Sequence, residues 1–161
     1  MSRERAVLVV IWVLSITAVI LFVPKSRRRE IILAYLVGQC ITWVNTLLHV
    51  QFRLLAFPVR EFPKSTDLLF TTEYFLYPVI CGLYFIHEPS GNGLARRVAY
   101  LAAWVSGLTL IDVLLEHYTN LIKYVHYAWY WTWLDFTALF MLTRLYCKWF
   151  LSRMNRIGTK P

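Results

Sequence analysis

Charged residues are scarce in this sequence. Asp, Glu, Lys and Arg make up 16% of the 161 residues, whereas 58% of the residues are hydrophobic. Ordinary soluble domains contain about a quarter charged residues and an apolar share of less than about half. The composition therefore excludes an ordinary soluble domain and predicts a chain that is surrounded mostly by lipid.

Cysteines are few as well, and the common catalytic motifs are missing. Cys40, Cys81 and Cys147 each stand alone in a different apolar run, which predicts buried reduced thiols and neither a disulfide framework nor a zinc site. Asp112, Glu116 and His117 lack the second histidine that a metalloprotease helix carries, and the sequence has no Gly-x-Ser-x-Gly motif and no phosphate loop. We therefore predict no enzymatic activity, no cofactor and no metal.

Long apolar runs are what the sequence does have. The first run, residues 6–23, has 18 residues without a charge and as a helix would span roughly 27 Å, close to the thickness of the hydrocarbon core. A basic block at residues 25–29 follows where a signal peptide would have its cleavage site, so we expect this helix to be retained. The sequence contains no internal repeat or low-complexity tract, which favours a single domain over residues 1–161. The five predicted membrane-spanning helices cover residues 6–23, 31–50, 68–87, 98–115 and 128–147. The predicted fold is an all-α bundle of a polytopic membrane protein.

Polar residues follow one face of the second predicted helix. Gly38, Thr42, Asn45 and His49 are spaced so that they share a face, which should contact protein and not lipid. A packing seam is favoured over a ligand-lining face, because small and polar residues let membrane helices approach each other closely. In the third helix, Pro78 predicts a kink and a carbonyl group without its helical partner.

The longest connection, residues 51–67, mixes aromatic, aliphatic and charged residues. Pro58 and Pro63 forbid one continuous helix there, and we expect a segment that lies at the level of the lipid head groups. The end of this segment, residues 65–67, offers Ser, Thr and Asp side chains that could cap the third helix.

The basic residues predict the orientation. The two sets of alternating termini and connections carry six and eleven Lys or Arg residues, and the positive-inside rule places the richer set in the cytoplasm. We therefore expect the N-terminus outside and the C-terminus inside. The net charge of +8 lies between the apolar runs, so it indicates contact with anionic lipid head groups at the inner face and not nucleic-acid binding. Trp and Tyr residues near the start of the fifth helix predict an interfacial aromatic belt that consists of Tyr118, Tyr124, Tyr127, Trp129, Tyr130, Trp131 and Trp133.

Several ionisable residues fall inside the apolar runs, all in the predicted outer half. Charged side chains are costly inside a membrane, so these acids should face protein or water. Structural hydrogen bonding, a shared proton or cation, and solvated helix ends are the three open explanations. The candidate proton or cation site consists of Asn45, His49, Glu73, Asp112, Glu116 and Asp135.

The C-terminal third of the chain carries a family resemblance. Residues 116–124 (EHYTNLIKY), 129–133 (WYWTW) and 144–150 (RLYCKWF) resemble a family of small integral membrane proteins of unknown function from Bacillus, Clostridium and relatives. The similarity covers residues 112–150, whereas the earlier helices agree in number and hydropathy. The resemblance implies a protein of the bacterial plasma membrane without catalytic residues.

Two functions remain open from the sequence. The leading prediction is a small multi-pass membrane protein with a structural or interaction role in the cell envelope. The alternative is a proton- or cation-coupled transporter or channel that uses the acids of the outer half. The transporter would work as a homo-oligomer, because five short helices enclose little space on their own.

Overall fold

The structure, a computed structural model, describes residues 3–89 and 93–158. It confirms the all-α class, with one addition, a two-stranded sheet made by β1 (Leu55–Ala56) and β2 (Lys123–Tyr124). The predicted turn at residues 90–92 and the chain ends, 1–2 and 159–161, lie outside the described residues. The helices are α1 (Arg3–Phe22), α2 (Arg28–Gln51), α3 (Tyr77–Ile86), α4 (Leu94–Tyr118) and α5 (Trp129–Gly158).

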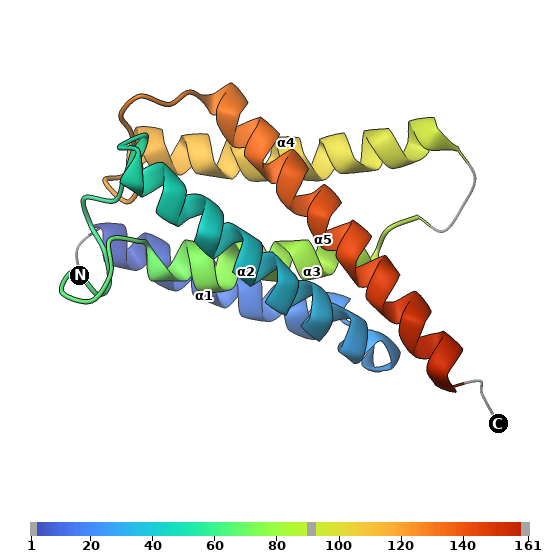
Figure 1. The fold of residues 1–161 in the computed structure, drawn as a ribbon. Coiled ribbons are helices and arrows are strands. Elements are labelled where there is room, and N and C mark those ends of the chain that lie inside the picture. The colour runs from blue at the N-terminus through green and yellow to red at the C-terminus, as the bar shows by residue number, and fades with distance from the viewer. Residues whose placement is uncertain (1–2, 90–92, 159–161) are drawn as a thin grey trace.

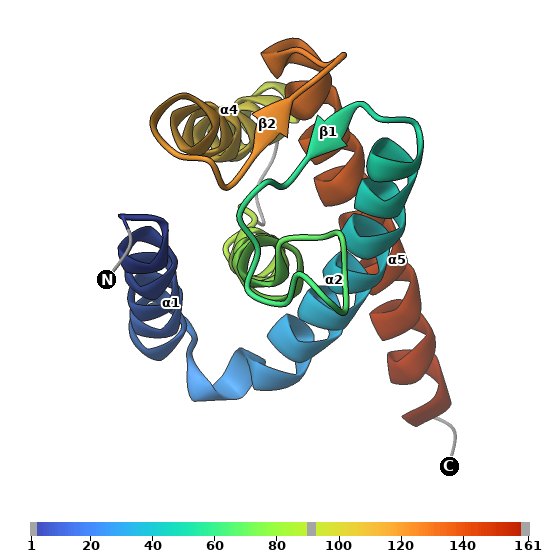
Figure 2. The ribbon, with the colours of Figure 1, turned by 90° about the vertical axis from the view of Figure 1, so that its left-hand side faces the viewer.

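The helices run side by side between two ends of the molecule (Figure 1). One end holds the start of α1 and the loops 52–69 and 119–128, and we call it the cap end. The opposite end, which we call the basic end, holds residues 25–29, residues 87–89 and the end of α5. Figure 2 shows α3 in the middle of the other helices, and every residue of α3 except Ile80 is buried.

Three of these helices are long and apolar enough to cross a membrane. Among the described residues they are Arg3–Phe22, Leu94–Tyr118 and Lys25–Gln51, which is α2 together with the short 3-10 turn Lys25–Arg27 before it. The outer face of α1 is apolar and exposed, as at Leu14 (63%) and Ile20 (72%). An apolar surface that continues along a whole helix indicates contact with lipid. The apolar helix before the basic end, Thr72–Ile86, is shorter, and α5 is more polar than these three.

Some predicted helix ends differ from the observed ones. α5 continues to Gly158, although its apolar run ends at residue 147, and α4 begins at Leu94 although its apolar run starts at residue 98. The physical reason is that an apolar run measures the thickness of hydrocarbon that a helix can cross. Backbone hydrogen bonding does not stop there when the next residues, such as Lys148 and Met154, are good helix formers.

The third helix changes its winding just before Pro78. The turn Thr72–Leu76 is π-helical, and the N–H of Tyr77 donates to the carbonyl oxygen five residues earlier. Pro78 has no N–H, so it cannot donate to the carbonyl oxygen of Tyr74. The Tyr35 hydroxyl on α2 donates to that oxygen instead, at 2.6 Å. The carbonyl that the sequence left unpaired is thus satisfied by a neighbouring helix.

α2 and α3 pack closely through small residues. A Cβ atom added to Gly38 of α2 would lie 3.0 Å from the Cβ of Cys81 on α3. Gly38, Thr42 and Thr46 are buried, whereas Leu47 and Leu48 on the other side of α2 are exposed. The polar stripe of α2 therefore faces protein, as its spacing predicted.

The two loops at the cap end are joined by the sheet. β1 and β2 pair antiparallel, with Leu55 opposite Tyr124 and Ala56 opposite Lys123. Phe57 in the first loop is buried, and the backbone N–H of Val59 donates to the carbonyl of Asn120 in the second loop. The two loops together close this end of the bundle, and we call them the cap.

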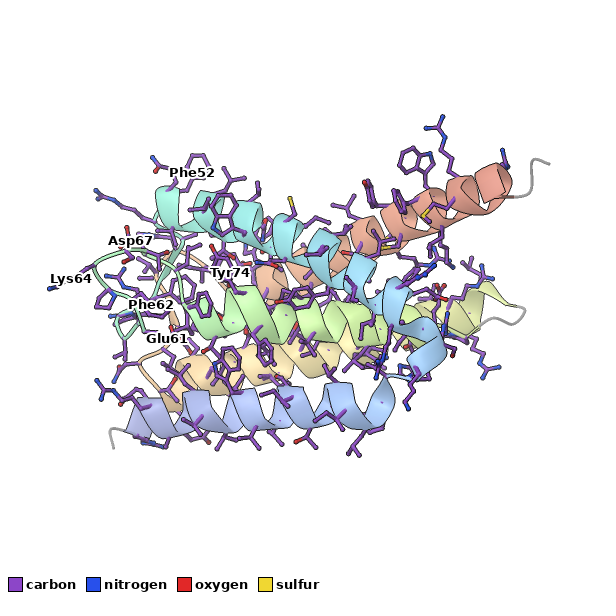
Figure 3. All side chains as sticks on the ribbon, turned by 90° about the horizontal axis from the view of Figure 1, so that it is seen from below. Phe52, Glu61, Phe62, Lys64, Asp67 and Tyr74 are labelled. Carbon is purple, nitrogen blue, oxygen red and sulfur yellow. The ribbon has the colours of Figure 1, made fainter. Side chains whose placement is uncertain are left out.

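The predicted N-cap of the third helix is wrong. The carboxylate of Glu61 accepts the backbone N–H groups of Phe70 and Thr71 at 3.1 and 3.0 Å. Thr66 only accepts the N–H of Leu68, and Asp67 pairs with an arginine. The loop that holds Glu61 turns back on itself after Phe62 (Figure 3), where the N–H of Ser65 donates to the carbonyl oxygen of Phe62, so the carboxylate can reach the helix.

Candidate functional site

A cavity of about 40 Å³ lies beneath the cap. Its walls come from α2, the third helix, α4, α5 and both cap loops, and the apolar part of the lining is Leu55, Phe57, Ile122 and Phe136. No Lys or Arg side chain within the described residues lines it. The polar lining residues are Asn45, Thr46, His49, Glu73, Tyr77, Asp112, Tyr127, Thr132 and Asp135.

His49 and Asp135 connect α2 with α5 at this cavity. Nε2 of His49 lies 3.1 Å from Oδ2 of Asp135, and Nδ1 of His49 lies 2.7 Å from the carbonyl oxygen of Asn45. Tyr127 donates its hydroxyl to the same Oδ2 of Asp135, and its ring meets the His49 ring edge-on at 5.1 Å between the ring centroids. Three segments of the chain therefore meet at one carboxylate.

The end of α2 holds His49 in position. The N–H of Leu54 donates to the carbonyl of His49 at 2.9 Å, and the N–H of Arg53 donates to that of Val50 at 3.0 Å. This pair of bonds is the Schellman motif, in which the residue after the cap adopts the left-handed conformation. Arg53 takes that place with φ +55°, where glycine is usual.

The other two acids are buried and each accepts one hydroxyl. Glu73 is 2% exposed, and Thr46 of α2 donates to its Oε2 at 2.9 Å. Asp112 is 6% exposed, and Tyr77 donates to its Oδ1 at 2.5 Å. Glu73 and Tyr77 lie one turn apart on the third helix, which brings the two acids to the same side of that helix.

Most of the predicted site residues come together in this cavity. Asn45, His49, Glu73, Asp112 and Asp135 all line it. Glu116 lies one turn beyond Asp112 on α4 and is not among the lining residues.

Four polar residues of the cavity lining were not among the predicted site residues: Thr46, Tyr77, Tyr127 and Thr132. A signal existed for Thr46, which continues the stripe of α2 one turn after Thr42, and for Tyr77, which follows Glu73 by one turn. A signal existed for Thr132 too, since it precedes Asp135 by about one turn on α5.

Tyr124 and Tyr127 turn inward, which corrects their assignment to the aromatic belt. The Tyr124 hydroxyl lies 3.0 Å from Oγ1 of Thr132, and Tyr127 contacts Asp135. Burial and the neighbouring Asp135 raise the pKa of Tyr127 well above its usual value, so its hydroxyl keeps the proton that it donates. The exposed belt residues are Tyr118, Trp129, Tyr130 and Trp131.

A second cluster of charges lies at the basic end. Nε of Arg144 is 2.7 Å and Nζ of Lys148 is 2.6 Å from the carboxylate of Glu88, whose side chain is 8% exposed. Burial acts to raise the pKa of Glu88, but the hydrogen bonds from Lys148 and Arg144 outweigh it, and the pKa lies below its ordinary value. Arg27 donates to the carbonyl of Ile86 at the end of α3. These contacts join the segment after α3 to α5, and the end of α3 to the turn before α2.

The fold and the cavity define a class, a helical protein with three membrane-length apolar helices and a polar cavity near one end. Within the described residues, no three His, Cys, Asp or Glu side chains are grouped so that they could hold a metal ion. The chain matches no model of a known protein family, no curated protein and no solved structure. The resemblance to small bacterial membrane proteins stays a prediction, and the function is inferred from the cavity.

Proposed function

We propose that this protein is an integral membrane protein that binds a proton or a small cation in the cap-end cavity and couples this binding to transport across the membrane. One observation carries the proposal: His49, Glu73, Asp112 and Asp135, which come from four different helical segments, converge on a single cavity. Ionisable side chains in membrane helices mark ion or proton sites by default, and these four share one site.

The proposal includes five membrane crossings, with the N-terminus outside and the C-terminus in the cytoplasm of a bacterial cell. The start of α1 and the end of α5 lie at opposite ends of the bundle, as an odd number of crossings requires (Figure 1). The short α3 is compatible with this topology because the other helices surround it (Figure 2). The basic end would then contact anionic lipid head groups on the cytoplasmic side.

The charge balance of the cavity favours a bound cation. An ionised carboxylate at the centre of a membrane helix costs about 2.5 to 3.5 kcal/mol on insertion scales. Three acids line the cavity, and within the described residues no Lys or Arg offsets them there. A volume of about 40 Å³ accommodates water molecules or a bare ion but no organic substrate. The proposed bound species is therefore a proton, or a small cation held by no more than two of these His, Asp and Glu side chains.

Further space lies next to this cavity on the side of the basic end. A second cavity of about 100 Å³ continues between α2 and α5 from Asp135 to Leu142. Beside it, Leu139 and Phe140 of α5 are buried at 4% and 0% exposure. The proposed transport requires an ion to pass these apolar side chains of α5 on its way to the basic end.

Flux measurements in liposomes test the proposal. The purified protein is reconstituted, and a potassium gradient with valinomycin sets the membrane potential while entrapped dyes report protons or sodium; potassium flux is followed without valinomycin. We expect flux of one of these ions above that of empty liposomes, and a loss of at least about tenfold in Asp135→Asn and Asp112→Asn. Asp67→Asn is the matched control, because that carboxylate is 73% exposed and lies outside the cavity. No flux in the wild type, or unchanged flux in both folded variants, would overturn the proposal.

A structural role in the cell envelope is the second candidate. It is favoured by the hydroxyl partner that each acid already has, from Thr46, Tyr77 or Tyr127. Such pairs can link helices without any bound ion. This candidate predicts that the acid-to-amide variants change the melting temperature while the wild type shows no flux of any tested ion.

A further inference from the structure

We infer that the cation in the cavity is a proton and that His49 and Asp135 hold it between them. The role of this proton in transport rests on the proposed function. Its presence rests on the hydrogen bonds of His49 alone, and it can be tested without measuring transport.

The first step concerns Nδ1 of His49. This nitrogen lies 2.7 Å from the backbone carbonyl oxygen of Asn45. A carbonyl oxygen only accepts hydrogen bonds, so Nδ1 must carry a hydrogen. One of the two ring nitrogens is thereby fixed as a donor.

The second step concerns Nε2. A neutral imidazole that is protonated at Nδ1 has a bare lone pair at Nε2. Nε2 lies 3.1 Å from Oδ2 of Asp135, and an ionised carboxylate also offers only lone pairs. Two lone pairs at this distance repel each other. A hydrogen must therefore lie between them, either on the ring, which makes an imidazolium, or on the carboxyl group. In both cases the pair holds one proton more than a neutral histidine and a carboxylate would.

The third step concerns the groups that face this pair. Tyr127 from the cap donates its hydroxyl hydrogen to Oδ2 of Asp135, so in this arrangement it is a donor to the pair and not the acceptor of the shared proton. Glu73 and Tyr77 of the third helix and Asp112 of α4 line the same cavity. Glu73 and Asp112 are either negatively charged or neutral, so neither of them repels a proton on the pair. No positively charged group of the described residues lines the cavity to displace that proton. The surroundings therefore favour retention of the proton by the pair.

Loss of the proton has a structural consequence. One ring hydrogen then remains for two contacts, so the contact between Nε2 of α2 and Oδ2 of α5 becomes repulsive whenever that hydrogen lies on Nδ1. Tyr127 ties the cap to the same carboxylate, so the cap loosens together with the two helices. Proton release thus opens the cavity at its cap end.

Nitrogen NMR on reconstituted protein tests the inference. The protein is labelled with ¹⁵N-histidine, and the His49 signals are assigned by their loss in His49→Asn. His117→Asn is the matched control, because His117 is exposed and does not line the cavity. Infrared spectra of the wild type and of Asp135→Asn report whether a protonated carboxyl band belongs to Asp135.

At about pH 7 we expect either two protonated nitrogens on His49 or a carboxyl band that disappears in Asp135→Asn. In Asp135→Asn, His49 should become neutral, with a single protonated nitrogen. A bare nitrogen on His49 in the wild type, without a carboxyl band from Asp135, would overturn the inference. After correction for the intrinsic rise of amide exchange with pH, the protection factors of residues 119–128 should fall about tenfold or more when the pH passes the point of proton loss, and those of α3 should not. Unchanged protection in the cap would contradict the opening of the cavity on proton loss.

The outcomes separate the two proposals. A held proton without ion flux would leave this inference standing and remove transport as the function. Flux with a bare His49 nitrogen would keep transport and show that a different group carries the ion.

Discussion

Gly82 of α3 lies so close to Ile31 of α2 that a Cβ atom on Gly82 would come within 2.6 Å of Cγ1 of Ile31. No L-amino acid other than glycine fits there unless the Ile31 side chain moves. Overpacking of this kind costs about 1 to 3 kcal/mol. We therefore predict that Gly82→Ala lowers the free energy of unfolding by that amount, measured by thermal or denaturant unfolding in detergent.

Gly107→Ala is the control for this prediction. A Cβ atom on Gly107 of α4 would meet nothing within 4 Å. Alanine is favoured over glycine in a helix by about 0.5 to 1 kcal/mol, so this variant should be neutral or slightly more stable. Equal destabilisation by both substitutions would show that the close approach of α2 and α3 is absent.

The left-handed residue at the end of α2 gives the second prediction. Arg53 has φ +55° in the Schellman motif, and a side chain in this conformation costs about 1 kcal/mol relative to glycine. Arg53→Gly should raise the free energy of unfolding by up to about 1 kcal/mol, since glycine takes this conformation without strain. Arg53→Ala should give no such gain, because alanine also has a Cβ atom. A gain in the free energy of unfolding with alanine would show that the charge of Arg53, and not its backbone conformation, causes the change.

The carboxylate of Glu61 gives the third prediction. Its two bonds to backbone N–H groups cap the third helix. Replacing such a cap costs about 0.5 to 2 kcal/mol, so Glu61→Ala should lower the melting temperature. Asp67→Ala removes a carboxylate from the same loop that pairs with Arg60 at the surface, and exposed pairs contribute about 0 to 1 kcal/mol. The larger effect should therefore belong to Glu61, and the reverse order would contradict the capping role.

The charge cluster at the basic end gives a pH dependence. The pKa of Glu88 is lowered in the folded protein from its ordinary value of 4.5, so its ion pairs stabilise the fold fully above that value. This stabilisation is lost as the pH falls below 4.5 through the lowered pKa. Glu88→Gln should be less stable than the wild type by about 1 to 3 kcal/mol near neutral pH, and the difference should shrink under acid conditions. Melting temperatures of both proteins across a pH series provide the measurement, and a constant difference would contradict the role of ionised Glu88.

The sequence was informative where a single physical cause acts over many residues. Apolar runs predicted helices near all five observed positions, because helices satisfy their own backbone in lipid. The stripe of α2 predicted a buried face, and the acids inside apolar runs predicted a shared site, because a buried charge needs partners. Both inferences depend only on periodicity and on the cost of burial.

The remaining features depend on contacts between distant residues. The inward position of Tyr127 follows from the pairing of β1 with β2, and two strands of two residues each leave no periodic pattern in the sequence. Glu61 was missed because its helix N–H partners come nine and ten residues later, beyond the spacing of a capping box. Glu116 was included because it follows Asp112 by one turn, but only Asp112 of the two lines the cavity. Such details are set by loop geometry, which hydropathy does not encode.

The pairing of His49 with Asp135 also determines when the cavity can form during synthesis of the chain. The first of these residues leaves the ribosome with α2, and its partner follows only with α5, after α3 and α4 have been made. β2, which fastens the cap, is likewise made just before α5. Until then, the cavity that contains Glu73 and Asp112 lacks its α5 wall, so a chain that is cut before α5 would leave these carboxylates uncovered and be a natural target for quality-control proteases.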